Sequence, residues 1–273
     1  MHGSAAVTVV AVLLALGVAS GCAVSDGAVA TRARDPAQDL RNAELGLGFD
    51  HVVVPGDMVP GTVNDGTATV DVTVVTAGGG RLTWTRGRDG GSAVRTPSYA
   101  PEGTVPAAAI VVRTDPSGPD PLDPGRRDLV IGVDFRGDPA TAGRPGDDGD
   151  NLVQRGRFGD PSQIKIQLDH AVPSCRLSGS SGAVVVTGDA PVTPGRWYRL
   201  TCSRAGPSVR LRLEDLDGGE RPRVWSVAGD PGEIGLAHVP LSIGAKIAAD
   251  GRIAGDSADQ FHGTIDRVLV DVR

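Results

Sequence analysis

The three cysteines are the residues whose chemistry follows most directly from the sequence. Once Cys22 is assigned to the N-terminal segment, Cys175 and Cys202 remain as an even pair. An exported compartment would let them oxidise to a disulfide, for which the chain-entropy model gives about 3–4 kcal/mol. Two buried free thiols are the alternative. The sequence has no CxxC motif and no Cys/His cluster, so nothing in the spacing indicates a zinc site.

Cys22 closes an N-terminal export signal. The apolar stretch from Ala5 to Ala19 has the length of a signal peptide and is too short to span a bilayer. It ends in Ala-Ser-Gly-Cys, which resembles the lipobox of bacterial lipoproteins, where small residues precede a cysteine that is acylated. The resemblance implies a lipoprotein-type signal peptide over residues 1–22 and a lipid anchor to the cell membrane at Cys22. Because the first residues carry no Lys or Arg, plain secretion is the alternative.

The residues needed for hydrolytic chemistry are present but not arranged for it. The five histidines are scattered, and no G-x-S-x-G nucleophile elbow occurs. Glycoside hydrolysis needs two carboxylates facing one bond, and Glu214 and Glu220 bound the acidic run that comes nearest to such a pair. The position two after Glu214 is Leu216 and a turn follows, so these carboxylates do not share one strand face. We therefore expect no enzyme, with a glycoside hydrolase as a minor alternative.

Strand patterns and turns dominate the chain from Leu45 onward. The sequence has 39 Gly and 20 Pro, and its many valines favour strands. Apolar residues alternate with polar ones in several segments, namely Val70–Val74, Ile164–Leu168, Val209–Leu213 and Thr264–Val272. These patterns predict an all-β fold, a two-sheet antiparallel β-sandwich (jelly roll) over residues 45–273. Residues 23–44 are small, polar and aperiodic, and predict a flexible tether with a faint helical stretch from Asp39 to Leu45.

The charge balance bears on possible partners. The net charge is -6, and the arginines are dispersed along the chain. A nucleic-acid-binding protein needs a clustered basic face, so the composition argues against a nucleic-acid partner.

An ordered set of segments in the C-terminal half carries a family resemblance. It comprises Asn151–Gly156, Gln163–Leu168, Ser174-Cys175-Arg176, Gly195–Cys202, Pro240–Gly244 and Phe261–Val268. This order resembles the laminin G-like, concanavalin A-like jelly-roll domains of exported bacterial proteins. The resemblance implies two antiparallel sheets, with Trp197 and Phe261 in or beside the core. A disulfide is common in such domains, and Cys175 and Cys202 stand at the matching places beside neighbouring predicted strands.

The same resemblance implies calcium, which such domains often bind on loops. Asp147, Asp148, Asp150 and Asn151 offer clustered oxygens, and Asp259 precedes the last predicted strand. Hard oxygen ligands suit Ca²⁺. The alternative is a flexible acidic loop without an ion.

The resemblance also frames the function that we expect. An extracytoplasmic binding or adhesion module for a glycan or another envelope component is the leading hypothesis. A structural envelope protein that makes only protein contacts is the alternative. Glycan binding usually needs exposed aromatic rings, and only 3% of the residues are aromatic. Trp84 and Trp225 have polar neighbours and are candidates, although half-buried strand positions explain them equally well.

Overall fold

The predicted two-sheet β-sandwich is confirmed. The computed structural model describes residues 36–50, 53–100, 105–139 and 149–273. One sheet, which we call sheet A, has the order β13 (Arg223–Ala228), β12 (Ser208–Asp215), β11 (Trp197–Arg204), β6 (Leu129–Gly137), β15 (Gly263–Val272), β4 (Ser92–Arg95) and β3 (Thr83–Arg86), with β1 (Leu45–Leu47) also paired to β15. The other, sheet B, has the order β10 (Gly182–Thr187), β9 (Val172–Gly179), β8 (Gln163–Asp169), β7 (Gly149–Arg155), β14 (Leu241–Ile243), β5 (Ala107–Thr114) and β2 (Val70–Ala77).

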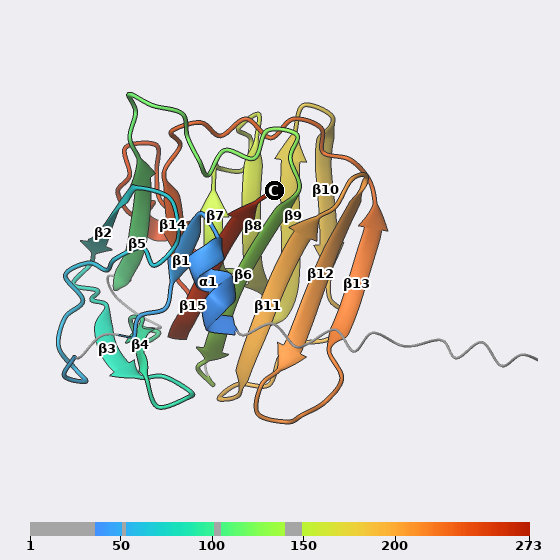
Figure 1. Cartoon of the computed structure of the whole chain (residues 1–273). Coiled ribbons are helices and arrows are strands. Elements are labelled where there is room, and N and C mark those ends of the chain that lie inside the picture. The colour runs from blue at the N-terminus through green and yellow to red at the C-terminus, as the bar shows by residue number, and fades with distance from the viewer. Residues whose placement is uncertain (1–35, 51–52, 101–104, 140–148) are drawn as a thin grey trace, which may run out of the picture. The chain divides into compact units, whose positions relative to one another are not determined.

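All strand pairs in both sheets are antiparallel, and the sheets lie face to face, with β6, β11, β12 and β13 in front of β8, β9 and β10 (Figure 1). The alternation read from the sequence decides which side chains point inward. Along β8, Ile164, Ile166 and Leu168 are buried, whereas Lys165 and Gln167 between them are partly exposed. Each strand therefore presents one apolar face to the shared core and one polar face outward.

Aromatic rings mark the centre of the core. Phe135 of β6 stacks on Tyr198 of β11 with ring centroids 5.8 Å apart, and meets Phe261 edge-on at 6.0 Å. Phe261 is 1% exposed, as the resemblance implied. Trp197 is also buried, but it lies beside the core, because it points to the other face of the sheet from its neighbour Tyr198. Arg136 covers its ring at 5.3 Å.

The two tryptophans considered as exposed platforms are not exposed. Trp84 of β3 is buried and meets Phe49 edge-on, with ring centroids 6.5 Å apart. Trp225 of β13 is half-buried against the core, with the Arg223 guanidinium 5.5 Å from its ring centroid. Trp225 therefore occupies a half-buried strand position, which was the alternative to an exposed platform, and Trp84 belongs to the core.

The predicted disulfide is present, but it does not join neighbouring strands. Cys175 lies in β9 of sheet B and Cys202 in β11 of sheet A, with Cα atoms 6.1 Å apart and a sequence separation of 27. The bond therefore crosses the core and ties one sheet to the other. Inward side chains of facing sheets approach each other across the core, and this allows the bridge.

The folded domain begins before Leu45, so the predicted boundary of the tether at residue 44 is too late. Helix α1 (Pro36–Asn42) packs on β1 and β15, and Leu40 and Ala43 are buried. Glu44 accepts a hydrogen bond from the backbone N–H of Val272 at 2.7 Å. The lipidation site predicted at Cys22 lies outside the described residues. Within the described residues, no helix has the length and apolar character needed to cross a membrane.

Candidate functional site: a polar groove on sheet B

The outward side chains of β8 and β9 line a shallow groove on sheet B. Its cavity measures about 190 Å³, and the lining consists of Gln163, Lys165 and Gln167 from β8, Ser174 and Arg176 from β9, Val185 from β10, and Phe158. The strand register explains the grouping, because Lys165 pairs with Arg176 and Gln167 with Ser174. Alternation along both strands turns all of these polar side chains to the same outer face.

Phe158 stands out at the edge of this groove. Of the four phenylalanines in the chain, the other three are buried in the core, whereas Phe158 is 84% exposed. It lies in the loop between β7 and β8, where Gly156 and Gly159 have positive φ angles of 75° and 93°. These left-handed backbone positions, which glycine adopts readily, shape the turn that presents the ring.

Arg176 is held in place between the strand and this ring. Its Nε donates a hydrogen bond to Gln163 Oε1 at 2.9 Å, and its guanidinium carbon lies 5.1 Å from the Phe158 ring centroid. A guanidinium held over an aromatic ring loses little further freedom when it binds a ligand. The groove thus combines a fixed cation, amide and hydroxyl groups, and an accessible aromatic ring.

Lys165 belongs both to the groove and to a small ionic cluster beside it. Lys165 and Lys246, the two lysines of the chain, place their Nζ atoms 3.2 and 3.1 Å from the same Asp259 Oδ2. Lys246 comes from the segment that follows β14 and lies over the outer face of sheet B. Burial lowers the pKa of Lys165, and the Asp259 carboxylate opposes that shift.

Two residues of the predicted calcium site, Asn151 and Asp259, come together, although the Asp259 carboxylate already contacts two lysines. The backbone N–H of Asn151 donates to the Asp259 carbonyl at 2.8 Å, and the Asn151 side-chain amide donates to Gln154. Asp150 is buried, and Asp147 and Asp148 lie outside the described residues. Over the part of the chain that the structure describes, no group of three His, Cys, Asp or Glu side chains is arranged to hold a metal ion. Calcium stays a prediction, and an ion at Asp259 would compete with two ammonium groups.

A second cavity of about 310 Å³ lies next to the groove, on the same face of sheet B. Gln154, His238 and Ser242 belong to its polar lining, and Val239, Pro240, Ile247 and Ala248 contribute apolar surface. The loop that carries Phe158 separates the two cavities, and it lines this one with Arg157 and Asp160, whose side chains form an ion pair at 3.1 Å.

Two carboxylates of the acidic run considered for hydrolysis, Asp215 and Glu220, line one cavity of about 250 Å³. Glu214 lies in β12, where its Oε2 is 2.7 Å from Arg212 Nη1, and Glu220 is exposed in the connection to β13. The sequence reading did not single out Phe158 or Arg176 as site residues. A signal for Phe158 existed, because a lone aromatic inside the polar, glycine-containing run Arg157–Ser162 has no strand to bury it.

Comparisons with known proteins address the fold. No family model matches the chain, and no curated protein matches it. Among solved structures, the binding domain of Paraclostridial Mosquitocidal Protein 1 has a TM-score of 0.55 and 15% identity, over 88% of this chain and 50% of that one. The binding domain of botulinum neurotoxin serotype G has a TM-score of 0.53 and 8% identity, over 85% and 48%. The chain thus spans about half the length of these toxin domains. The likeness supports the fold alone, a two-sheet antiparallel β-sandwich.

Proposed function

We propose that this protein is an extracytoplasmic binding module that holds a glycan in the groove of sheet B. The observation that carries the proposal is Phe158, which is 84% exposed and lies against Arg176 at the edge of a groove lined by amides and a hydroxyl. An exposed aromatic ring beside convergent polar side chains usually marks a binding surface.

The chemistry of the groove suits a sugar. A sugar ring offers apolar C–H faces that pack on an aromatic ring, and hydroxyl groups that both donate and accept hydrogen bonds. Gln163, Gln167 and Ser174 supply donors and acceptors, and Lys165 and Arg176 supply donors only. The small cavity of about 190 Å³ suits one sugar unit at a time, with the rest of the glycan crossing the open face.

Two further observations support this proposal. The two toxin structures reported above are described as binding domains, which is consistent with a non-catalytic role. The Cys175–Cys202 disulfide fits an oxidising, extracytoplasmic compartment. Anchoring through a lipid on Cys22 completes the proposal, with secretion as the alternative. Partitioning of the exported protein into detergent, lost in Cys22→Ser, would support the anchor.

A glycan array followed by titration of the best ligand tests the proposal. We expect Phe158→Ala and Arg176→Gln each to weaken binding by about tenfold or more, because each removes a group on the groove surface. Met58→Ala is the matched control, since Met58 is also an exposed apolar residue (61%) but bridges to β3 in sheet A.

Two results would contradict glycan binding in this groove. One is a blank array together with a stoichiometric protein partner, which would favour the structural envelope protein. The other is a glycan whose affinity does not change in Phe158→Ala and Arg176→Gln, which would place its site elsewhere on the molecule.

A further inference from the structure

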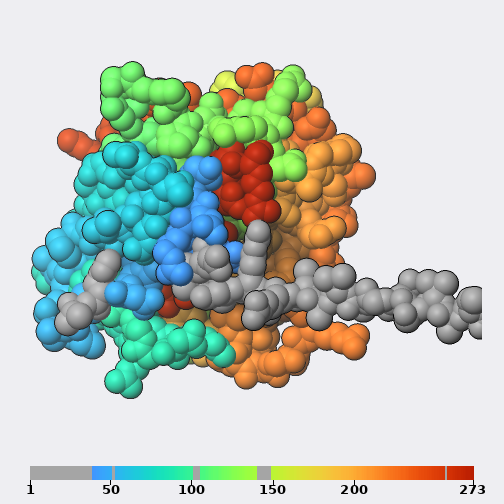
Figure 2. All heavy atoms as spheres, in the orientation of Figure 1, coloured from blue at the N-terminus to red at the C-terminus, as the bar shows by residue number. Residues whose placement is uncertain are grey.

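Another cavity, of about 540 Å³, lies on the outer face of sheet A. Val130 and Gly132 of β6 and Leu269 of β15 lie at its base, and α1 borders it through Asp39, Leu40 and Asn42. In Figure 2 this region lies where the red end of β15 meets the blue helix and the orange strands β11 and β12. Gly132, which has no side chain, faces Thr201 and Leu269 on its two neighbouring strands and leaves the base open.

Four arginines, three of them from different strands, line this cavity, although the chain as a whole is acidic. They are Arg199 of β11, Arg212 of β12, Arg267 of β15 and Arg273, which follows β15. The sheet order brings them together, because β12, β11, β6 and β15 are successive neighbours. We call this cavity the arginine groove.

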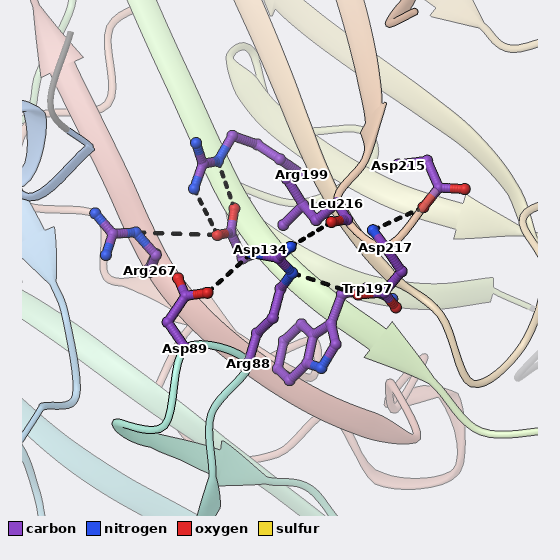
Figure 3. A network of polar contacts seen from close by, with 9 residues as sticks. All are labelled: Arg88, Asp89, Asp134, Trp197, Arg199, Asp215, Leu216, Asp217 and Arg267. Carbon is purple, nitrogen blue, oxygen red and sulfur yellow. Dashed lines mark hydrogen bonds and ion pairs between the residues drawn. The ribbon is translucent and has the colours of Figure 1, made fainter. Parts of the chain in front are cut away.

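Asp134 fixes two of these arginines from below. Arg199 binds it in a two-point contact, from Nε to Oδ1 and from Nη2 to Oδ2, each at 2.7 Å. Arg267 approaches from the opposite side, with Nε 3.9 Å from Asp134 Oδ2. Figure 3 shows both guanidinium groups around the same carboxylate, one from β11 and one from β15. Side chains held in this way are oriented before any ligand arrives.

Arg267 has two unusual features. It lies in a β-bulge of β15 and has a φ angle of 48°, in the left-handed region that costs free energy for a side chain of its size. Its Nη2 atom is buried and has no hydrogen-bond partner among the described residues. A buried guanidinium donor without an acceptor is unfavourable, and an anion in the cavity would contact the rest of the Arg267 side chain, which is 17% exposed.

The carboxylates around the cavity leave room for such an anion. Glu214 and Asp271 contact Arg212 and Arg273 through ion pairs whose side chains are 18–55% exposed, and ion pairs that remain open to solvent contribute little. Asp39 lies on the helical rim, and Asp134 is covered by the two arginines that it orients.

We propose that the arginine groove binds a phosphate group. The guanidinium groups approach from three strands and from the residue after β15, and therefore from several directions. A phosphate offers oxygens in several directions, whereas a carboxylate offers two in a single plane. Thr201 and Asn42 add neutral hydrogen-bonding groups to the lining. This site is separate from the sheet B groove and does not depend on glycan binding there.

Isothermal titration of the full chain with inorganic phosphate at low ionic strength tests the proposal. We expect saturable binding that weakens by about tenfold or more in Arg212→Gln and in Arg267→Gln. Because Arg267 also contacts buried Asp134, Arg212→Gln is the variant that leaves the Asp134 contacts intact. Gly132→Ala should weaken binding as well, since its added Cβ meets Leu269 and Thr201 at an ordinary 3.7 Å and narrows the base of the cavity.

Arg252→Gln is the matched control, because Arg252 is 87% exposed, pairs with Asp250 and lies outside the groove. Phosphate affinity should not change in this variant. Absence of saturable binding would overturn the proposal, and so would an Arg252→Gln effect as large as that of Arg212→Gln. Sedimentation with phosphatidylglycerol vesicles, competed by phosphate, would identify a lipid headgroup as the source. Binding of free phosphate without vesicle binding would identify a soluble phosphate, and the site holds in both cases.

Discussion

The two outer faces of the sandwich are built on the same strand alternation but carry different chemistry. On sheet B, the groove consists of amides, a hydroxyl and two cations beside the exposed ring of Phe158. On sheet A, the arginine groove has four arginines, a glycine at its base and a buried Asp134 beneath. The inward residues of both sheets are similarly apolar, so the fold sets few limits on the outward positions. The two proposed sites therefore differ through the outward residues of each sheet.

Removing the disulfide should have the largest effect and should affect both faces. We expect Cys175→Ala/Cys202→Ala to lower the free energy of unfolding by about 3–4 kcal/mol, because the bridge closes a loop with a sequence separation of 27. Urea denaturation measures this loss. Cys22→Ser should leave it unchanged. A loss below about 1 kcal/mol would mean that core packing alone holds the sheets together.

A change of pH should have the next largest effect, and it should act on stability through Asp266 of sheet A. Burial, together with the Asp134 carboxylate opposite it in the strand register, raises the pKa of Asp266 to about 8. The folded state then holds a proton that the unfolded chain releases near pH 4. Stability from this group is therefore present below pH 4 and is lost as the pH rises toward 8.

Asp266→Asn isolates this contribution. Relative to the variant, the wild type should lose about 2–3 kcal/mol of unfolding free energy between pH 5 and pH 7. Urea denaturation at both pH values measures it. Asp50 and Arg267 also act on Asp266, the first raising and the second lowering its pKa. Parallel pH profiles for wild type and Asp266→Asn would show that the carboxyl group titrates normally.

Each groove variant should also be tested with the ligand of the opposite face. We expect a variant to weaken the affinity for its own ligand by about tenfold, or about 1.4 kcal/mol, and to leave the affinity for the other ligand unchanged. Phe158→Ala should weaken the glycan and leave phosphate binding unchanged, and Arg212→Gln should do the reverse. Added salt should weaken phosphate binding more than glycan binding, because salt screens exposed charges. If Phe158→Ala also weakens phosphate binding, the two faces are coupled or share one ligand.

Calcium should have the smallest effect. Because Lys165 and Lys246 already contact Asp259, we expect millimolar CaCl₂ to raise the melting temperature by less than about 1 °C. Asp259→Asn is the comparison variant. A larger rise that disappears in Asp259→Asn would favour the calcium site predicted from the sequence.

The sequence predicted the parts of the fold that depend on local pattern. Alternation such as Ile164–Leu168 identifies a strand and its inward face without knowledge of its neighbours. The cysteine count predicted the bridge, but not that it crosses between sheets, since strand order is a long-range property. The helix before Leu45 was assigned to the tether because its few buried residues give too weak a period to separate it from polar linker sequence.

The two grooves could not be predicted in the same way. Arg199 and Arg267 are far apart in the chain, and they meet only because β6 lies between β11 and β15. Asp259 was considered as a calcium ligand because it is a carboxylate that precedes the last predicted strand. Folding brings Lys165 and Lys246 to it from two other segments. The contacts of a polar residue thus depend on which strands are neighbours, and the periodicity of the sequence does not encode the order of the strands.

The position of the disulfide has a mechanical consequence. Cys175 lies between Ser174 and Arg176 of the sheet B groove, and Cys202 directly follows Thr201 of the arginine groove. A pull on a ligand in one groove would therefore reach the opposite sheet through a covalent bond, and not only through packed side chains that can slide. Under load, with one face attached and the other engaged, the sandwich would resist shearing of its two sheets at the strands that bear both grooves.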